Sequence, residues 1–155
     1  MLIPSDVKKT FAGMYARAFC HATEDIDKVR LALTNVVGDT DVRTSRTEGH
    51  HGNPILILDA SVASMDEIAA FFEKLNAADI ERLRESLESR MDDGCNLFMR
   101  VDKQAALNED VVLAAGEDVI SIRIKVVAYP SRRDIALGSV VEFLDGERSR
   151  RTNQR

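Results

Sequence analysis

Two adjacent histidines, His50 and His51, stand between glycines in the stretch TEGHHGNPI. A structural zinc ion needs about four Cys or His ligands in short paired spacings, and the chain's histidines and cysteines show no such spacing. Adjacent side chains on a strand point to opposite sides, so this pair is poorly placed to share one ion. The sequence therefore predicts no metal site and no cofactor.

The same stretch has two interpretations that its spacing does not separate. As a turn, it uses Gly49 and Gly52 for backbone with positive φ, and Asn53 followed by Pro54 precedes a strand. As a binding loop, it offers imidazoles that stack on bases and donate hydrogen bonds to phosphate or ribose, which suits a position facing RNA. Both interpretations stay open at this point.

Basic and aromatic residues alternate with apolar residues in two later segments. In VISIRIKVVAY, the isoleucines point to one side and Arg123 and Lys125 to the other. In CNLFMRV, Phe98 and Arg100 share the side opposite the apolar residues, and Arg17 can join them from the first strand. A sheet face with basic and aromatic side chains is a recognised way to hold RNA, whereas the alternative is an ordinary solvated face.

Asp102, Lys103 and Gln104 follow the second of these segments. A carboxylate and a lysine beside a histidine could support phosphodiester hydrolysis, with His50 or His51 as the proton carrier. The sequence has no P-loop, no HExxH motif and no Ser-His-Asp order. A phosphoesterase or nuclease that uses these residues is therefore an alternative hypothesis, and we assign no catalytic residue.

The charge balance restricts where a nucleic acid could bind. The net charge is -5 and the pI is about 5.2, which is unfavourable for phosphate binding unless a local patch is basic. Arginines cluster in GERSRRTNQR, and we expect residues 147–155 to form a basic disordered tail. Such a tail is either a solvated end or an auxiliary phosphate contact.

The sequence also predicts a compartment. Cys20 and Cys95 lie far apart and form no CxxC motif, as expected for reduced thiols. The start, MLIPSDVKK, lacks the apolar segment of a signal peptide, and no apolar stretch approaches the roughly 20 residues needed to cross a bilayer. We expect a soluble cytoplasmic protein with no membrane partner.

The periodicity predicts the order strand, helix, two strands, two helices, two or three strands, helix. The first strand is expected at residues 15–20 with Thr23 capping the next helix, and Ser64 with Glu67 forms a capping box. DKQAALNED is expected to be a loop or a short irregular segment. Because strands and helices do not alternate strictly, the fold class is α+β, a two-layer sandwich of a mostly antiparallel sheet with helices packed on one face.

Four blocks in this order, FCHATEDIDKVRLAL, TEGHHGNPILIL, LFMRVDKQAAL and VISIRIKVVAYP, together resemble an archaeal family of predicted RNA-binding proteins associated with the exosome. The resemblance covers roughly residues 15–144. It implies a double-stranded-RNA-binding-domain-like or ribosomal-protein-like α+β fold, RNA as partner, and no established enzymatic step. The family has tyrosine where this chain has His51, so a stacking surface is replaced there by a smaller, titratable ring.

We therefore predict a non-enzymatic RNA-binding protein that recognises structured RNA through backbone contacts and assists RNA processing or ribosome-related functions. Residues 1–146 are expected to form a single domain. The alternatives are the hydrolase above and a protein adaptor in an RNA-processing complex, the exosome or another; a homodimer is also open. The predicted RNA-binding residues are His50, His51, Asn53, Arg100, Lys103, Gln104, Arg123 and Lys125.

Overall fold

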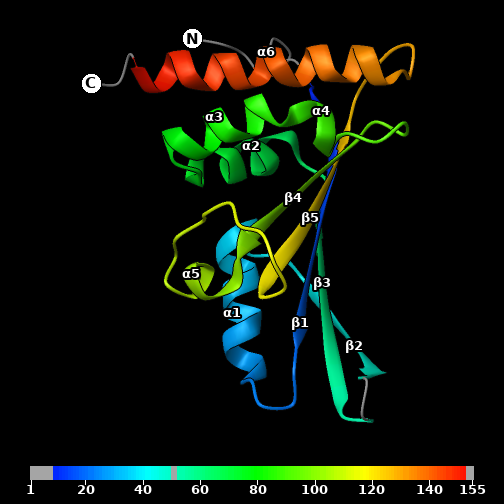
Figure 1. Ribbon diagram of the computed structural model, residues 1–155, viewed down its shortest axis with the longest axis vertical. Helices are drawn as coiled ribbons and strands as arrows, with labels where there is room; N and C mark the ends of the chain where they lie inside the picture. The colour runs from blue at the N-terminus through cyan, green and yellow to red at the C-terminus, as the bar shows by residue number, and fades with distance from the viewer. Residues whose placement is uncertain (1–8, 50–51, 153–155) are drawn as a thin grey trace.

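The computed structural model describes residues 9–49 and 52–152 (Figure 1). The elements follow the predicted order, with short additional helices. They are β1 (Phe11–Cys20), α1 (Ile26–Val37), β2 (Val42–Glu48), β3 (Pro54–Val62), α2 (Met65–Lys74), α3 (Ala77–Glu85), α4 (Leu87–Arg90), β4 (Asn96–Asp102), α5 (Lys103–Leu107), β5 (Val119–Val126) and α6 (Arg133–Thr152).

The strands form one five-stranded antiparallel sheet in the order β2-β3-β1-β5-β4. Helices α1, α2 and α5 lie on one side of this sheet, and α3 and α6 stack beyond α2 at one end (Figure 1). This arrangement confirms the predicted α+β fold. None of the helices in the described part of the chain is long and apolar enough to span a membrane.

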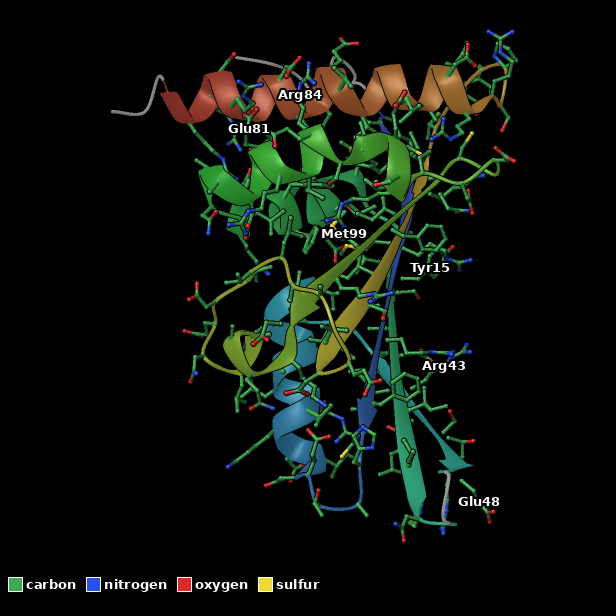
Figure 2. The ribbon with its side chains drawn as sticks, in the orientation of Figure 1. Tyr15, Arg43, Glu48, Glu81, Arg84 and Met99 are labelled. Carbon is green, nitrogen blue, oxygen red and sulfur yellow. The ribbon has the colours of Figure 1, made fainter. Side chains whose placement is uncertain are left out.

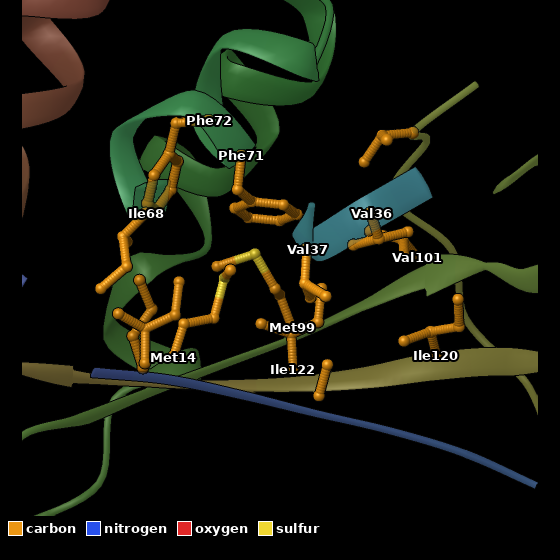
Figure 3. Close-up of a cluster of buried hydrophobic side chains, with 14 of the residues drawn as sticks. Met14, Val36, Val37, Ile68, Phe71, Phe72, Met99, Val101, Ile120 and Ile122 are labelled. Carbon is orange, nitrogen blue, oxygen red and sulfur yellow. The ribbon is translucent and has the colours of Figure 1, made fainter. Parts of the chain in front are cut away.

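The core fills the space between the sheet and its helices (Figure 3). Met14, Met99 and Ile122 project from neighbouring strands toward Phe71 of α2 and Val37 of α1, and all five are at most 3% exposed. Buried residues alternate with exposed or half-buried residues along β4 and, from Ile120 onward, along β5, which turns one face of each strand inward. Each fully buried large apolar side chain contributes about 1.5–3 kcal/mol. The side chains on the opposite face of these two strands therefore point away from the helices.

Local capping sets the helix boundaries, in one case as predicted and in one case not. The Ser64 Oγ accepts a hydrogen bond from the Glu67 N–H at 3.4 Å, which confirms that Ser64 caps α2. The predicted cap at Thr23 is wrong, because Asp25 caps α1 and accepts from the Asp27 N–H at 2.9 Å. Aspartate and threonine are both good N-caps, so composition alone did not separate them.

Two further predictions about elements are corrected. The first strand starts at Phe11, because Phe11 and Met14 belong to the buried side of the sheet. The segment after β4 is not a loop throughout, since α5 begins directly after Asp102. The Asp102 carboxylate accepts a hydrogen bond from the Ala105 N–H at 2.7 Å and so starts this short helix.

The predicted disordered tail is wrong up to Thr152, because α6 continues through this segment. Arg150 donates to both oxygens of the Glu147 carboxylate at 2.8 Å, and Glu147 is only 7% exposed. Arg151 donates to the Phe72 carbonyl at 2.7 Å and to the Leu75 carbonyl. Arg150 also lies 3.2 Å from the Glu73 carboxylate of α2. This contact and those of Arg151 hold α6 on α2, and residues 153–155 lie outside the described part.

Candidate functional site

The side of the sheet that faces away from α1 and α2 carries polar and aromatic side chains in register. Tyr15 and Arg43 project from this side in Figure 2. Cross-strand pairing forms one row that crosses all five strands. From β2 to β4 this row consists of Arg43, Asp59, Arg17, Ser121 and Arg100.

A second row lies next to the first and contains Ser61, Tyr15, Arg123 and Phe98. Tyr15 is 45% exposed and Phe98 is 44% exposed, which are large fractions for aromatic side chains. The guanidinium carbon of Arg123 lies 4.6 Å from the centre of the Tyr15 ring, a cation–π contact. We call these two rows together the open sheet face.

The sequence prediction for this face is confirmed in its alternation. Phe98, Arg100 and Arg123 are exposed on the side opposite the buried residues of β4 and β5. Lys125 is only partly exposed, and its ammonium donates to the Gly94 carbonyl at the end of the sheet. Arg100 is therefore better placed than Lys125 to meet a ligand on the open sheet face.

Within the described residues, three of the four arginines of the open sheet face have no acidic partner, whereas Arg17 pairs with Asp59. Across residues 9–49 and 52–152, Arg43, Arg100 and Arg123 make no ion pair with a carboxylate. The arginines that do are Arg17, Arg30, Arg82, Arg84, Arg132, Arg148, Arg150 and Arg151. Three guanidinium groups without a carboxylate partner in the described residues thus lie on one face of a chain whose net charge is -5.

Two depressions hollow this surface. One, of about 890 Å³, lies over the centre of the sheet and is lined by Tyr15, Arg43, Phe98 and Arg123 among others. The other, of about 530 Å³, lies between β4, α4 and residues 114–115. Phe98 lines both of them. Acidic side chains also reach the larger depression, and Asp59 there is held by Arg17 at 2.7 Å.

Arg90 is a residue that the sequence did not indicate as functional, because its helix reads as an ordinary charged face. It lines the smaller depression together with Arg100 and Phe98. Its Nε donates to the Ser86 Oγ at 2.7 Å, which fixes the guanidinium group. Burial, and then the like charge of Arg100, lower the pKa of Arg90. Two guanidinium groups are thus held near each other, an arrangement that favours an anion between them.

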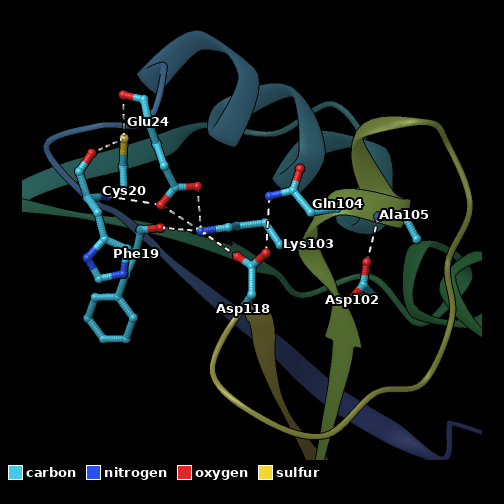
Figure 4. Close-up of polar contacts among 9 residues, drawn as sticks. Phe19, Cys20, Glu24, Asp102, Lys103, Gln104, Ala105 and Asp118 are labelled. Atoms are coloured by element: carbon cyan, nitrogen blue, oxygen red, sulfur yellow. Dashed lines mark hydrogen bonds and ion pairs between the residues drawn. The ribbon is translucent and has the colours of Figure 1, made fainter.

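Lys103 is placed differently from its prediction (Figure 4). It is 4% exposed, and its ammonium lies 2.9 Å from the Phe19 carbonyl, 2.9 Å from the Glu24 carboxylate and 3.1 Å from the Asp118 carboxylate. An ammonium has three donors, and three acceptors occupy them here. The prediction that Lys103 contacts phosphate is therefore corrected, because its ammonium group is bound by two carboxylates and a carbonyl of the protein itself.

Gln104 belongs to the same network. Its amide donates to Asp118 at 3.1 Å, and α5 packs against α1 on the helical side of the sheet. Burial alone would raise the pKa of Asp118, but hydrogen bonds from Lys103 and Gln104 outweigh burial and hold the pKa below its ordinary value. Gln104 thus does not lie in the rows of the open sheet face.

Gly49 and Gly52 lie in the turn between β2 and β3, and the geometry there favours glycine at both positions. The Gly49 N–H donates to the Asn53 carbonyl at 2.7 Å, and Gly52 has φ of 77°. A Cβ at Gly49 would lie 2.9 Å from the Ile55 Cδ1, too close for any other residue without a shift. Asn53 is exposed at this turn. His50 and His51 lie outside the described residues, so their role toward RNA stays a prediction.

No group of three or more His, Cys, Asp or Glu side chains in the described ranges could hold a metal ion. Lys103, the lysine that a phosphoesterase mechanism would use, is neutralised by Glu24 and Asp118. The open sheet face offers cationic and aromatic side chains, which suit contacts with an anionic ligand that carries planar rings.

Comparison with known proteins gives the class to which this chain belongs. A family model described as RNA binding matches residues 14–126, a span that holds most of β1 and all of β2 to β5. The chain therefore belongs to this family. Both rows of the open sheet face lie within the matched residues.

Two individual relatives are similar to most of this chain. The chain is 38% identical over 141 residues to RNA-binding protein PAB1135 of Pyrococcus abyssi, covering 84% of this chain and 92% of that protein. Over 114 residues it is 30% identical to the uncharacterized protein MJ0213 of Methanocaldococcus jannaschii, covering 66% and 76%.

Two solved structures of the DUF54 family have the same fold. Mth689 of Methanothermobacter thermautotrophicus superposes with a TM-score of 0.77 at 33% identity, covering 87% of this chain and 98% of that one. Protein AF2318 of Archaeoglobus fulgidus gives 0.76 at 31% identity, covering 85% and 98%.

Proposed function

We propose that this chain binds RNA on the open sheet face. The observation that supports it is the gathering of unpaired Arg43, Arg100 and Arg123 around exposed Tyr15 and Phe98 on an acidic chain. Guanidinium groups bind phosphate oxygens in bidentate geometry, and aromatic rings stack on bases. The RNA-binding description of the family and of the Pyrococcus relative points to the same ligand.

We further propose that the RNA is structured and is held mainly through its backbone, and that binding assists RNA processing or ribosome-related work. Asn53 and the histidine loop would add hydrogen bonds at the far end of β2 and β3. RNA on the open sheet face leaves the helical side free for a protein partner, such as the exosome or another RNA-processing assembly. We propose a binding role and not a catalytic one, which is supported by the engagement of all three Lys103 donors within the protein.

The test is a double substitution, Arg100→Glu with Arg123→Glu, measured by fluorescence anisotropy with a labelled stem-loop RNA between about 50 and 200 mM salt. We expect the affinity to collapse and the slope of log affinity against log salt to shrink by about 0.7–0.9 for each phosphate contact removed. Both side chains are exposed, so the fold should persist.

A matched control changes the same amount of charge elsewhere. Lys28→Glu with Arg132→Glu alters an exposed residue of α1 and one just before α6, both outside the open sheet face. This pair should keep most of the affinity and all of the salt slope. The proposal fails if both double variants lose affinity equally, or if the Arg100 and Arg123 variant binds like the parent at every salt concentration.

A further inference from the structure

Phe98 occupies an unusual place on the open sheet face. It lies on β4, at the edge of the sheet, and it lines both the depression of about 890 Å³ and the depression of about 530 Å³. Ser121 and Ile122 on the neighbouring strand also line both. Phe98 is therefore the aromatic residue shared by the two hollows, and its side chain is exposed.

The other aromatic side chain of this row is partly covered. The guanidinium group of Arg123 lies over the ring of Tyr15, with 4.6 Å between its carbon and the ring centre. Phe98 makes no such contact within the described residues, although Arg123 is also its cross-strand partner. Of these two rings, Phe98 is the one left available to stack on a ligand.

The smaller hollow beside Phe98 carries charge of one sign. Arg100 follows Phe98 by two residues on the same face of β4, and Arg90 enters from α4. Neither guanidinium group pairs with a carboxylate in the described part of the chain, and Arg90 is tethered by the Ser86 hydroxyl. An aromatic ring beside two arginines matches the parts of one nucleotide, a planar base and an anionic phosphate.

We propose that Phe98 stacks on an unpaired RNA base whose phosphate is held between Arg90 and Arg100, so that the ligand carries a single-stranded segment at this site. This inference rests on the proposed function and names the part of the RNA that reaches the sheet. In the interior of an A-form duplex each base is stacked on both faces by its neighbours and cannot also stack on a protein ring. A structured RNA bound here therefore presents a loop, a bulge or a single-stranded end to Phe98.

The experiment compares Phe98→Ala with Phe19→Ala. Phe19 is 40% exposed, close to the 44% of Phe98, but it lines neither hollow. The probes are a labelled oligouridine of about 12 nucleotides, within the site sizes typical of single-strand binders, and a blunt duplex of the same length. We expect Phe98→Ala to weaken oligouridine binding by about 5- to 150-fold and to leave duplex binding and the Phe19→Ala variant near the parent.

Two further variants keep the result interpretable. Phe98→Leu retains apolar bulk without a π surface and should lose binding like Phe98→Ala, with an unchanged urea midpoint as the check on folding. The chain has no tryptophan, so Phe98→Trp places a single tryptophan at the site, and its emission can be excited selectively over that of the two tyrosines. Its emission should be quenched by oligouridine and not by the duplex, because quenching requires base contact.

The outcomes separate the two proposals. If Phe98→Ala and Phe98→Leu bind oligouridine like the parent while Arg100→Glu with Arg123→Glu abolishes binding, the stacking inference falls and the proposed function stands. The stacking inference also falls if Phe98→Ala weakens duplex and oligouridine equally. If neither the arginine pair nor Phe98 affects any RNA, both proposals fall together.

Discussion

The substitution Lys103→Met tests whether this lysine holds the protein together or holds RNA. Its ammonium contacts Phe19, Glu24 and Asp118, and methionine keeps the aliphatic volume while removing the charge. Removing one partner of a buried ion pair costs about 3–5 kcal/mol, because the other charge is left uncompensated. The structure therefore predicts a loss of stability and not a loss of affinity.

The expected loss of stability is smaller than about 3–5 kcal/mol because both carboxylates remain partly hydrated. The side chains of Glu24 and Asp118 are 23% and 57% exposed, whereas that of Lys103 is 5% exposed. We expect Lys103→Met to lower the free energy of unfolding by about 2–3 kcal/mol. In a chain of this size each kcal/mol lowers the melting temperature by about 2–4 °C, so the shift should be about 4–12 °C.

Urea unfolding followed by circular dichroism measures the stability, and anisotropy with the stem-loop RNA measures the affinity well below the midpoint. The matched control is Lys28→Met, which removes an exposed lysine of α1 and should change stability by no more than about 0.5 kcal/mol. Adding Glu24→Gln to Lys103→Met should recover part of the loss, since it removes an unpaired charge. The reasoning is refuted if Lys103→Met is as stable as Lys28→Met while RNA binding weakens and the salt slope shrinks, because Lys103 would then contact phosphate.

Two further predictions follow from the same network and from α6. Because the pKa of Asp118 lies below its ordinary value of 3.8 in the folded chain, its contribution to stability is complete above that pH and disappears as the pH falls through the lower, folded pKa. The free energy of unfolding, measured from about pH 5 to about pH 2, should therefore fall less steeply in Asp118→Asn than in the parent. Arg151→Ala removes donors to the Phe72 and Leu75 carbonyls and should destabilise the chain by about 1.5–3 kcal/mol in urea unfolding. Arg132→Ala, at an exposed ion pair, should cost less than about 1 kcal/mol, and equal effects would mean that α6 is not held by Arg151.

The sequence predicted well the features that depend on local periodicity and on the spacing of neighbouring residues. Isoleucines at every second position of β5 could only be buried together on one side of a strand, which placed Arg123 on the other side. The same rule placed Phe98 and Arg100 together on β4. Ser64 and Glu67 predicted the start of α2 because the hydrogen bond between them spans one helical turn.

The sequence missed the features that depend on ion pairs and hydrogen bonds between residues that are distant in the sequence. Nothing near Lys103 in the sequence distinguishes a surface lysine from one held by Glu24 and Asp118, which are brought to it by α1 and the start of β5. Arg90 reads as part of a solvated helix until α4 is seen beside β4. The arginines after Glu147 read as a tail because their partners, Glu73 and the carbonyls of Phe72 and Leu75, are distant in sequence.

The net charge of -5 would disfavour nucleic-acid binding only if a bound phosphate responded equally to all the charges of the chain. At physiological ionic strength the Debye length is about 8 Å, so a phosphate responds mainly to the charges within that distance when they are exposed. Acidic residues on α1, α2 and α3 lie on the other side of the sheet, and many of them are already paired with arginines. A phosphate on the open sheet face meets Arg43, Arg100 and Arg123, which make no ion pair in the described part of the chain, and Asp59, which Arg17 neutralises. Asp41 also lines the larger depression, so the three arginines outnumber the one acidic side chain there that makes no ion pair in the described residues. Arg17→Glu breaks the pair with Asp59 and places a second carboxylate beside Asp59. It should therefore weaken RNA binding more than Arg132→Glu, although both substitutions alter the net charge equally.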